Sequence, residues 1–265
     1  MGSIGDNQLA ALSGYTGTIQ DRIRKALVNP PTDTGTIDDL GGYLGRTVFW
    51  SSPADETNLV GWYTPDSIDV TGSDVTQWND LSGEANHLSD TTGVYPQNTG
   101  SIGGVACVKF SNTVYISTTV TYSQPMTVLI VAQDSVANFT RNLFSGHLAS
   151  GTRYVGGTSA TNYAFNFGNT VNITYTRDTD PHVFSFVING ASSSMYVDGT
   201  LIGSGNVGAL GFQRITLGGI INPFQGWDGD IAEAVFISEA ADATTHNRNG
   251  QYLADIYGTT WNAVS

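Results

Sequence analysis

The sequence predicts a mainly β protein, a two-sheet antiparallel sandwich preceded by a small helical segment. Three observations predict this fold class. The 265 residues are 40% hydrophobic and only 12% charged, and they include 32 glycines, which is typical of turn-rich β proteins. Short apolar runs separated by turn dipeptides fill the chain from about residue 57 onward. Helical periodicity is confined to the first 45 residues and to one stretch near the C-terminus.

The N-terminal segment carries two helix-start signals. The hexapeptide TGTIQD, which begins at Thr16, returns as TGTIDD at Thr34. In the first copy, Thr18 and Asp21 have the spacing of a capping box, and an apolar stripe at helical spacing follows them. The repeated hexapeptide is therefore interpreted as a helix-start signal that is used twice.

Helices this short cannot bury enough apolar surface to be stable alone, so their apolar faces must pack against something else. We predict that residues 1–45 are a helical attachment segment, that residues 46–58 form a linker, and that residues 59–265 form the sandwich. The predicted assembly interface is the apolar stripe of the segment, which consists of Leu9, Leu12, Tyr15, Ile19, Ile23 and Leu27. The same stripe could also join copies of the chain into a homo-oligomer.

The sandwich is predicted from a series of apolar runs. These runs cover residues 125–134, 182–190, 194–205, 214–220 and 229–238. The third run contains Asp198-Gly199, which predicts a hairpin with a type I′ turn. A final helix is expected over residues 244–258. Many strands with frequent turns and few helical stripes favour two packed sheets.

Charge and hydropathy exclude several classes of protein. The formal net charge is −13, and the few basic residues are scattered, so we predict no binding to nucleic acid. No apolar stretch approaches the roughly 20 residues of a membrane span, and the N-terminus lacks the pattern of a signal peptide. We expect a protein made in the cytoplasm without a signal peptide and not inserted into a membrane. The single cysteine, Cys107, is interpreted as a buried structural thiol.

Two parts of the chain resemble known families. The stretch LAALSGYTGTIQDRIRKAL resembles short N-terminal segments of structural proteins of tailed phages. Residues 59–261 resemble concanavalin-A-like, laminin-G-type jelly-roll domains, through LVGWYTPDSIDVTGSDVTQWNDLSGEANHL, GGVACVKF, FQGWDGDIAEAVFIS and NGQYLADIYGTTW. This second resemblance implies a jelly-roll sandwich and says little about the ligand. In its opening motif, Asp80, Ser82 and Asn86 are expected to cap turns, His87 to lock a turn, and Trp62 and Trp78 to lie in the core.

Concanavalin-A-like folds include glucanases, whose motif E-x-D-x-x-E resembles DGDIAE at Asp228, Asp230 and Glu233. The first position is a shorter aspartate, and the resemblance places the stretch on a structural strand. No nucleophile elbow, phosphate loop or zinc-ligand spacing is present either. We therefore predict no enzyme, no catalytic residues and no cofactor. Calcium is left open, with loop carboxylates as candidates at Asp66, Asp69, Asp74, Asp178, Asp180, Asp198, Asp228 and Asp230.

The stretch NPFQGWDGD combines aromatic, amide and carboxylate groups in one irregular segment, the chemistry that jelly-roll lectins use for sugars. It predicts a carbohydrate site at Asn222, Trp227 and Asp228. The alternative, which the sequence favours for the tryptophan, is that Trp227 closes the edge of the sandwich as a core residue.

These observations together predict a non-enzymatic phage virion protein at the virion surface. The predicted form is a capsid decoration or head fibre, with an outward lectin-like domain able to adhere to host-surface glycans. Its predicted partners are other capsid or tail proteins, bound through the N-terminal segment. A tail fibre or receptor-binding protein, or a free carbohydrate-binding module, is the alternative.

Overall fold

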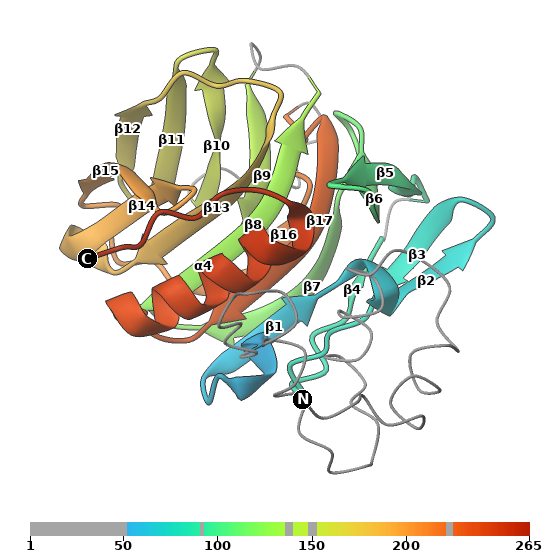
Figure 1. The fold of residues 1–265 in the computed structure, drawn as a ribbon, viewed down its shortest axis with the longest axis horizontal. Coiled ribbons are helices and arrows are strands. Elements are labelled where there is room, and N and C mark those ends of the chain that lie inside the picture. Colours follow the sequence, from blue (N-terminus) through green and yellow to red (C-terminus); the bar gives the residue numbers. More distant parts are fainter. Residues whose placement is uncertain (1–51, 91–92, 136–139, 148–152, 221–224) are drawn as a thin grey trace, which may run out of the picture. The chain divides into compact units, whose positions relative to one another are not determined.

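The computed structural model describes residues 52–90, 93–135, 140–147, 153–220 and 225–265. The chain divides into two compact units, Met1–Ser52 and Pro53–Ser265. The predicted N-terminal helices and the predicted assembly interface lie outside the described residues. The described part is mainly β, with seventeen strands, one α-helix and three short 3-10 helices, and all ladders between its strands are antiparallel (Figure 1). The predicted fold class is confirmed at this level.

One curved layer contains the strands nearest the helix. In hydrogen-bonded order it runs β15, β14, β13, β8, β17 and β1. These strands are β1 (Leu59–Tyr63), β8 (Met126–Asp134), β13 (Pro181–Ile188), β14 (Ser193–Val197), β15 (Thr200–Gly205) and β17 (Gly229–Ile237). The central strands β8 and β17 are almost continuously buried, as expected for strands covered on both faces.

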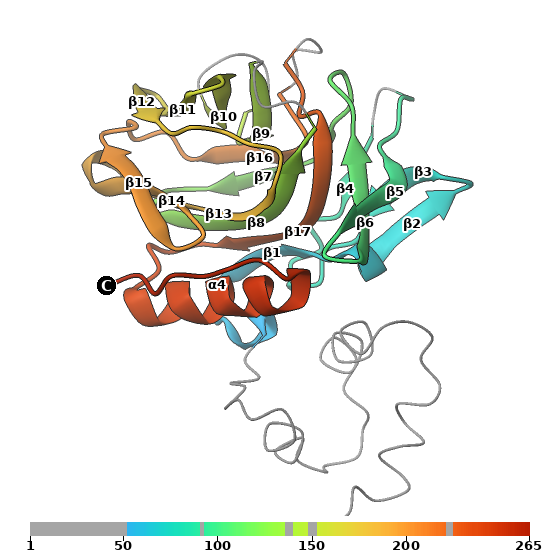
Figure 2. The same ribbon diagram turned by 45° about the horizontal axis from the view of Figure 1, so that its top comes forward.

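The second curved layer faces the first across the hydrophobic core (Figure 2). In hydrogen-bonded order it runs β12, β11, β10, β9, β16, β7 and β4. These strands are β4 (Leu88–Ser89), β7 (Ile116–Tyr122), β9 (Arg141–Ser145), β10 (Arg153–Ser159), β11 (Asn162–Phe167), β12 (Thr170–Thr174) and β16 (Phe212–Leu217).

Four further strands join the two layers: β2 (Ile68–Thr71), β3 (Asp74–Trp78), β5 (Gln97–Ile102) and β6 (Val105–Phe110). Strand β3 pairs with β4 of the second layer and with β5, and β6 pairs with both β5 and β17 of the first layer. The strands therefore form one continuous, nearly barrel-shaped antiparallel network. The predicted division into two separate sheets is matched only in part.

The predicted strands and the final helix are present close to their expected bounds. The run 125–134 forms β8, and the run 194–205 forms the β14–β15 hairpin. Asp198 and Gly199 at its turn have φ angles of 51° and 75°, the left-handed conformation that a type I′ turn requires. The helix, α4 (Ala243–Tyr257), follows Asp242. The Asp242 side chain caps the helix by accepting a hydrogen bond from the Thr245 amide.

The opening motif of the domain folds as a hydrogen-bonded turn. The Asp80 carboxylate accepts the backbone N–H groups of Trp62, Ser82 and Asn86, and the Asp80 amide donates to Nδ1 of His87. Trp78 is fully buried, and only 3% of Trp62 is exposed. The predicted turn-capping role of Asp80 and the core roles of Trp62 and Trp78 are confirmed, whereas the Asn86 side chain instead donates to the Val60 carbonyl and to the Tyr122 hydroxyl.

Helix α4 covers the outer face of the first layer and is fixed there by polar contacts. Glu56, which follows the 3-10 helix η1 (Pro53–Asp55), accepts hydrogen bonds from Arg248 and Asn249 of the helix. These residues before β1 were predicted as the end of the linker.

His246 of α4 lies next to Trp261, and its Nε2 is 2.5 Å from the Ser185 hydroxyl of β13. Burial lowers the pKa of His246 to about 4. The remaining 3-10 helices are η2 (Pro65–Ser67) and η3 (Gly190–Ser192).

Candidate functional site

Three neighbouring strands of the first layer meet at one edge of the domain. The register pairs Asp230 of β17 with Gln133 of β8, and Gln133 with Pro181 of β13. Because β8 is antiparallel to both neighbours, it ends where β17 and β13 begin. The residues around these strand ends form what we call the loop edge: Asn112, Asp134, Arg141, Tyr175, Arg177, Asp178, His182 and Asp228.

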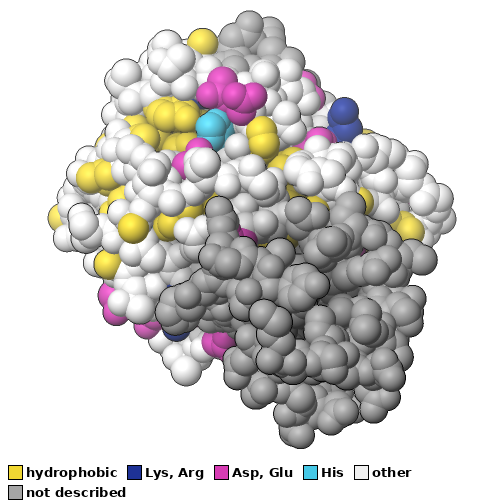
Figure 3. Space-filling view, in the orientation of Figure 1, with side chains coloured by type: hydrophobic (Ala, Val, Ile, Leu, Met, Phe, Trp, Pro, Cys, Tyr) yellow, Lys and Arg dark blue, Asp and Glu magenta, His cyan; other side chains and the backbone are white. Residues whose placement is uncertain are grey.

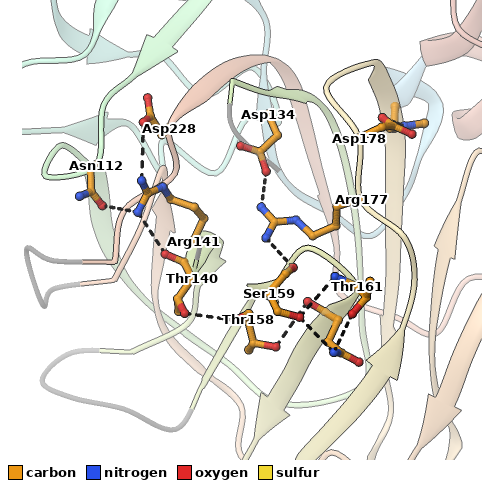
Figure 4. A network of polar contacts seen from close by, with 12 residues as sticks. Asn112, Asp134, Thr140, Arg141, Thr158, Ser159, Thr161, Arg177, Asp178 and Asp228 are labelled. Atoms are coloured by element: carbon orange, nitrogen blue, oxygen red, sulfur yellow. Dashed lines mark hydrogen bonds and ion pairs between the residues drawn. The ribbon is translucent and has the colours of Figure 1, made fainter. Parts of the chain in front are cut away.

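At one side of the loop edge, Arg141 organises a polar cluster (Figure 4). Its Nη1 donates to Oδ1 of Asn112 at 2.9 Å and to the Thr140 carbonyl at 3.2 Å. Its Nη2 lies 3.7 Å from Oδ2 of Asp228. The Arg141 side chain is 11% exposed and that of Asp228 is 32% exposed, so the guanidinium is held in place while the carboxylate keeps access to solvent. This arrangement offers an accessible acceptor beside a guanidinium that is held in place.

In the middle of the loop edge, Arg177 and Asp134 form a buried ion pair, with side chains that are 1% and 5% exposed. Nη1 of Arg177 also donates to the Ser159 carbonyl at 3.0 Å. A Cβ atom at Gly157 would lie 2.1 Å from this guanidinium, so only glycine leaves room for it. Removing one member of such a pair leaves an uncompensated buried charge. The pair therefore fixes the loop before β13 against the end of β8.

At the other side, His182 is held between two carboxylates. Its Nδ1 lies 2.6 Å from Asp198 and its Nε2 lies 2.9 Å from Asp178. Burial alone would lower the pKa of His182, but the hydrogen bonds to Asp198 and Asp178 outweigh it and raise the pKa to about 9. The imidazole is thus protonated at neutral pH, and both N–H groups donate to carboxylates.

A tyrosine stands beside this histidine. The Tyr175 ring is half-buried, with its centroid 6.5 Å from that of His182 and 6.1 Å from that of Tyr163. Burial, followed by the charges of Asp178 and Asp198, raises the pKa of Tyr175 to about 12, so the phenol keeps its proton. Figure 3 shows hydrophobic side chains gathered next to a histidine and acidic side chains on this face of the domain.

The residues predicted to bind carbohydrate have different surroundings in the structure. Asp228 lies at the loop edge and is accessible. Trp227 is fully buried in the core, edge-on to Phe184 with ring centroids 6.5 Å apart, so its ring offers no face to a ligand. This is the position that the alternative core role describes. Asn222 lies outside the described residues.

The three carboxylates of DGDIAE also have separate surroundings. Glu233 is fully buried, and it accepts hydrogen bonds from Trp62 Nε1 at 2.6 Å and from the Tyr257 hydroxyl at 2.8 Å. It joins β17 to β1 and α4. Asp230 lies near the backbone amide of Ser101, and burial raises its pKa. Cys107 is buried, as predicted, and burial followed by the charge of Asp230 raises the pKa of its thiol.

Within the described ranges, no group of three or more His, Cys, Asp or Glu side chains is arranged to hold a metal ion. The candidate carboxylates for calcium include no such group among those residues. No helix in the described part of the chain is long and apolar enough to cross a membrane.

Comparison with known proteins gives similarity of fold only. No protein-family model matches the chain, and no curated protein matches it by sequence. Among solved structures, Trypanosoma rangeli sialidase in complex with sialic acid matches with a TM-score of 0.58 and 14% identity, over 97% of this chain and 40% of the sialidase. The same sialidase with the inhibitor DANA gives 0.56 and 16%, over 97% and 40%. The binding domain of Paraclostridial Mosquitocidal Protein 1 gives 0.51 and 12%, over 78% and 56%.

These similarities show that the domain shares its β fold with these solved structures. The chain spans about two fifths of the length of the sialidases that it matches. The prediction that the protein is not an enzyme is corrected by this comparison: sialidases are among the structures that share the fold, so the fold gives no ground for excluding glycan chemistry. The matched structures carry no indication of a virion protein, so that role stays a prediction.

Proposed function

We propose that residues 53–265 form a glycan-binding domain of jelly-roll type, and that the loop edge is its binding surface. The observation that carries this proposal is the Arg141–Asn112–Asp228 cluster. It places a solvent-accessible carboxylate beside a guanidinium that Asn112 and the Thr140 carbonyl hold at the end of the strands. Sugar hydroxyls both donate and accept hydrogen bonds, so they match a surface that presents both kinds of group. The fold that the chain shares with a sialidase supports a glycan as the class of ligand.

The charge of the protein favours a neutral glycan. The formal net charge is −13, and the carboxylates of Asp228 and Asp178 are the more exposed charges of the loop edge, where Arg141, Arg177 and His182 are largely buried. An anionic polysaccharide would be repelled by this field, most strongly at low ionic strength. We therefore infer that the ligand is an uncharged sugar chain.

A glycan array with the intact protein tests the proposal, followed by calorimetry on each glycan that binds. Asp228→Asn keeps the shape of the side chain but removes the charge, and we expect it to weaken binding about tenfold, the loss expected for a hydrogen bond to a charged group. Asp69→Asn on strand β2, an exposed carboxylate away from the loop edge, is the matched control and should bind as the wild type does. Failure of the wild type to bind any neutral glycan would refute the proposal.

The same samples test for hydrolysis of the bound glycan. Incubation of each bound glycan with the protein, followed by an assay for released reducing ends, distinguishes binding alone from hydrolysis. Release of reducing ends that is lost in Asp228→Asn would identify the loop edge as an active site.

We further propose a setting for this domain: the surface of a phage virion, with the N-terminal segment bound to a capsid or tail protein. The support is the resemblance of that segment to phage structural proteins and its apolar stripe from Leu9 to Leu27. Deletion of residues 1–45 should leave a protein that melts cooperatively and is absent from purified particles. Normal incorporation of the truncated protein into particles would contradict this setting.

A further inference from the structure

We propose that the loop edge binds an extended oligosaccharide through two separate subsites, rather than a single sugar. The first subsite is the Asp228–Arg141–Asn112 cluster. The second is formed by the Tyr175 ring and the Asp178 carboxylate. This inference rests on the proposed function and adds to it the class of ligand, a chain of several neutral sugar units.

The spacing of the strands sets the separation of the two subsites. Asp228 precedes β17, and Tyr175 stands against His182 at the start of β13, with β8 between these two strands. Neighbouring strands lie about 4.8 Å apart, so two steps across the layer separate the subsites by roughly 10 Å. This distance is wider than one sugar ring, so a single ring cannot contact both subsites, whereas a chain of linked rings can.

The second subsite has the chemistry for one face and one edge of a sugar. An aromatic ring such as that of Tyr175 packs against the apolar face of a sugar ring. The Asp178 side chain is 47% exposed, and its Oδ1 is held by His182 and by the backbone amide of Asp180. Because these two donors fix the carboxylate, it can accept a sugar hydroxyl without a further loss of side-chain freedom.

The part between the subsites is rigid. The Arg177–Asp134 pair is buried there, so it does not contact the ligand and instead keeps the two subsites in register. Gln133 adds to this by donating from its side chain to the Thr179 carbonyl at 2.8 Å. A rigid separation predicts that affinity depends on the length of the glycan.

The experiment measures affinity by calorimetry against glucose, galactose and mannose and against their neutral oligomers of increasing length. We expect affinity for the preferred series to rise about tenfold or more when the chain becomes long enough to reach both subsites. Tyr175→Ala should abolish that gain because it leaves only the first subsite, whereas Asp228→Asn should weaken the binding of short and long chains. Tyr175→Phe keeps the ring and should keep the gain. Tyr95→Ala, at a half-buried tyrosine between β4 and β5, is the matched control.

Each outcome distinguishes this inference from the function on which it rests. No binding to any sugar overturns both. Binding that is independent of chain length, or a length gain that survives in Tyr175→Ala, overturns the two subsites and leaves the binding domain standing. If Tyr175→Ala fails to fold, Asp178→Asn takes its place, and it should reduce the gain in affinity with chain length, with a retained melting transition as the check on folding.

Discussion

Replacing Trp227 by alanine tests whether this residue belongs to the core or to a ligand site. The side chain is fully buried, and two hydrogen bonds hold the backbone at this position. The Gly226 amide donates to the Asn112 carbonyl at 2.9 Å, and the Trp227 amide donates to the Gly218 carbonyl at 2.8 Å. The backbone at Trp227 therefore cannot move inward to fill the space that the indole leaves. We expect the loss to lie in the upper part of the range of about 3–5 kcal/mol that is typical of buried Trp→Ala changes.

For a domain of this size, such a loss lowers the melting temperature by roughly 10 °C or more. Thermal unfolding followed by near-ultraviolet circular dichroism, with Trp227→Phe as the conservative variant, measures it. The phenylalanine keeps most of the buried apolar area and should lose much less. A melting temperature for Trp227→Ala within about one degree of the wild type would refute the core assignment. If Trp227→Ala lost glycan binding at unchanged stability, Trp227 would be assigned to the binding site instead.

Three further predictions concern stability. Glu233→Ala leaves two buried donors without their acceptor and should cost at least about 3 kcal/mol in urea unfolding, whereas Glu233→Gln, which keeps one acceptor, should cost less. Because the folded pKa of His246 is about 4, below the unfolded value, its contribution is complete above about pH 6.5 and should be lost as the pH falls towards 4, a slope that His246→Gln should remove. The folded pKa of His182 is about 9, so its contribution is complete below about pH 6.5 and should be lost as the pH rises through 9; melting curves that are flat over that range would contradict this.

The strands were predictable because their signals are local. The run at 125–134 is strongly apolar and contains several β-branched residues, and Asp198-Gly199 marks the turn of the hairpin at 194–205. How the layers close was not predictable, because it depends on short strands with little apolar content. Strand β4 has two residues, and β5, QNTGSI, reads as a loop, yet these strands connect the two layers. Pairing between distant segments supplies the stabilisation that their sequences lack.

The candidate site was predictable only where it lies within one segment. Asp228 was found because it stands in an irregular stretch with other polar groups. Arg141 and Asn112 were missed because they are 87 and 116 residues before it in the sequence, and only the strand order brings them together. Trp227 had two interpretations, because a tryptophan next to glycine and aspartate can bind a sugar or close the sandwich edge; the sequence favoured the core role, and the side chain is fully buried.

The antiparallel pairing of β1 with β17 has a mechanical consequence. Leu59 at the start of β1 lies opposite Ile237, whereas Asp228 lies beyond the other end of β17. A pull on the chain that precedes residue 59, resisted by a ligand held at Asp228, therefore acts along the two strands in opposite directions. The hydrogen bonds between β1 and β17 are then loaded together in shear, instead of breaking one after another from one end. Tension applied between these two points should thus be borne by the whole ladder at once.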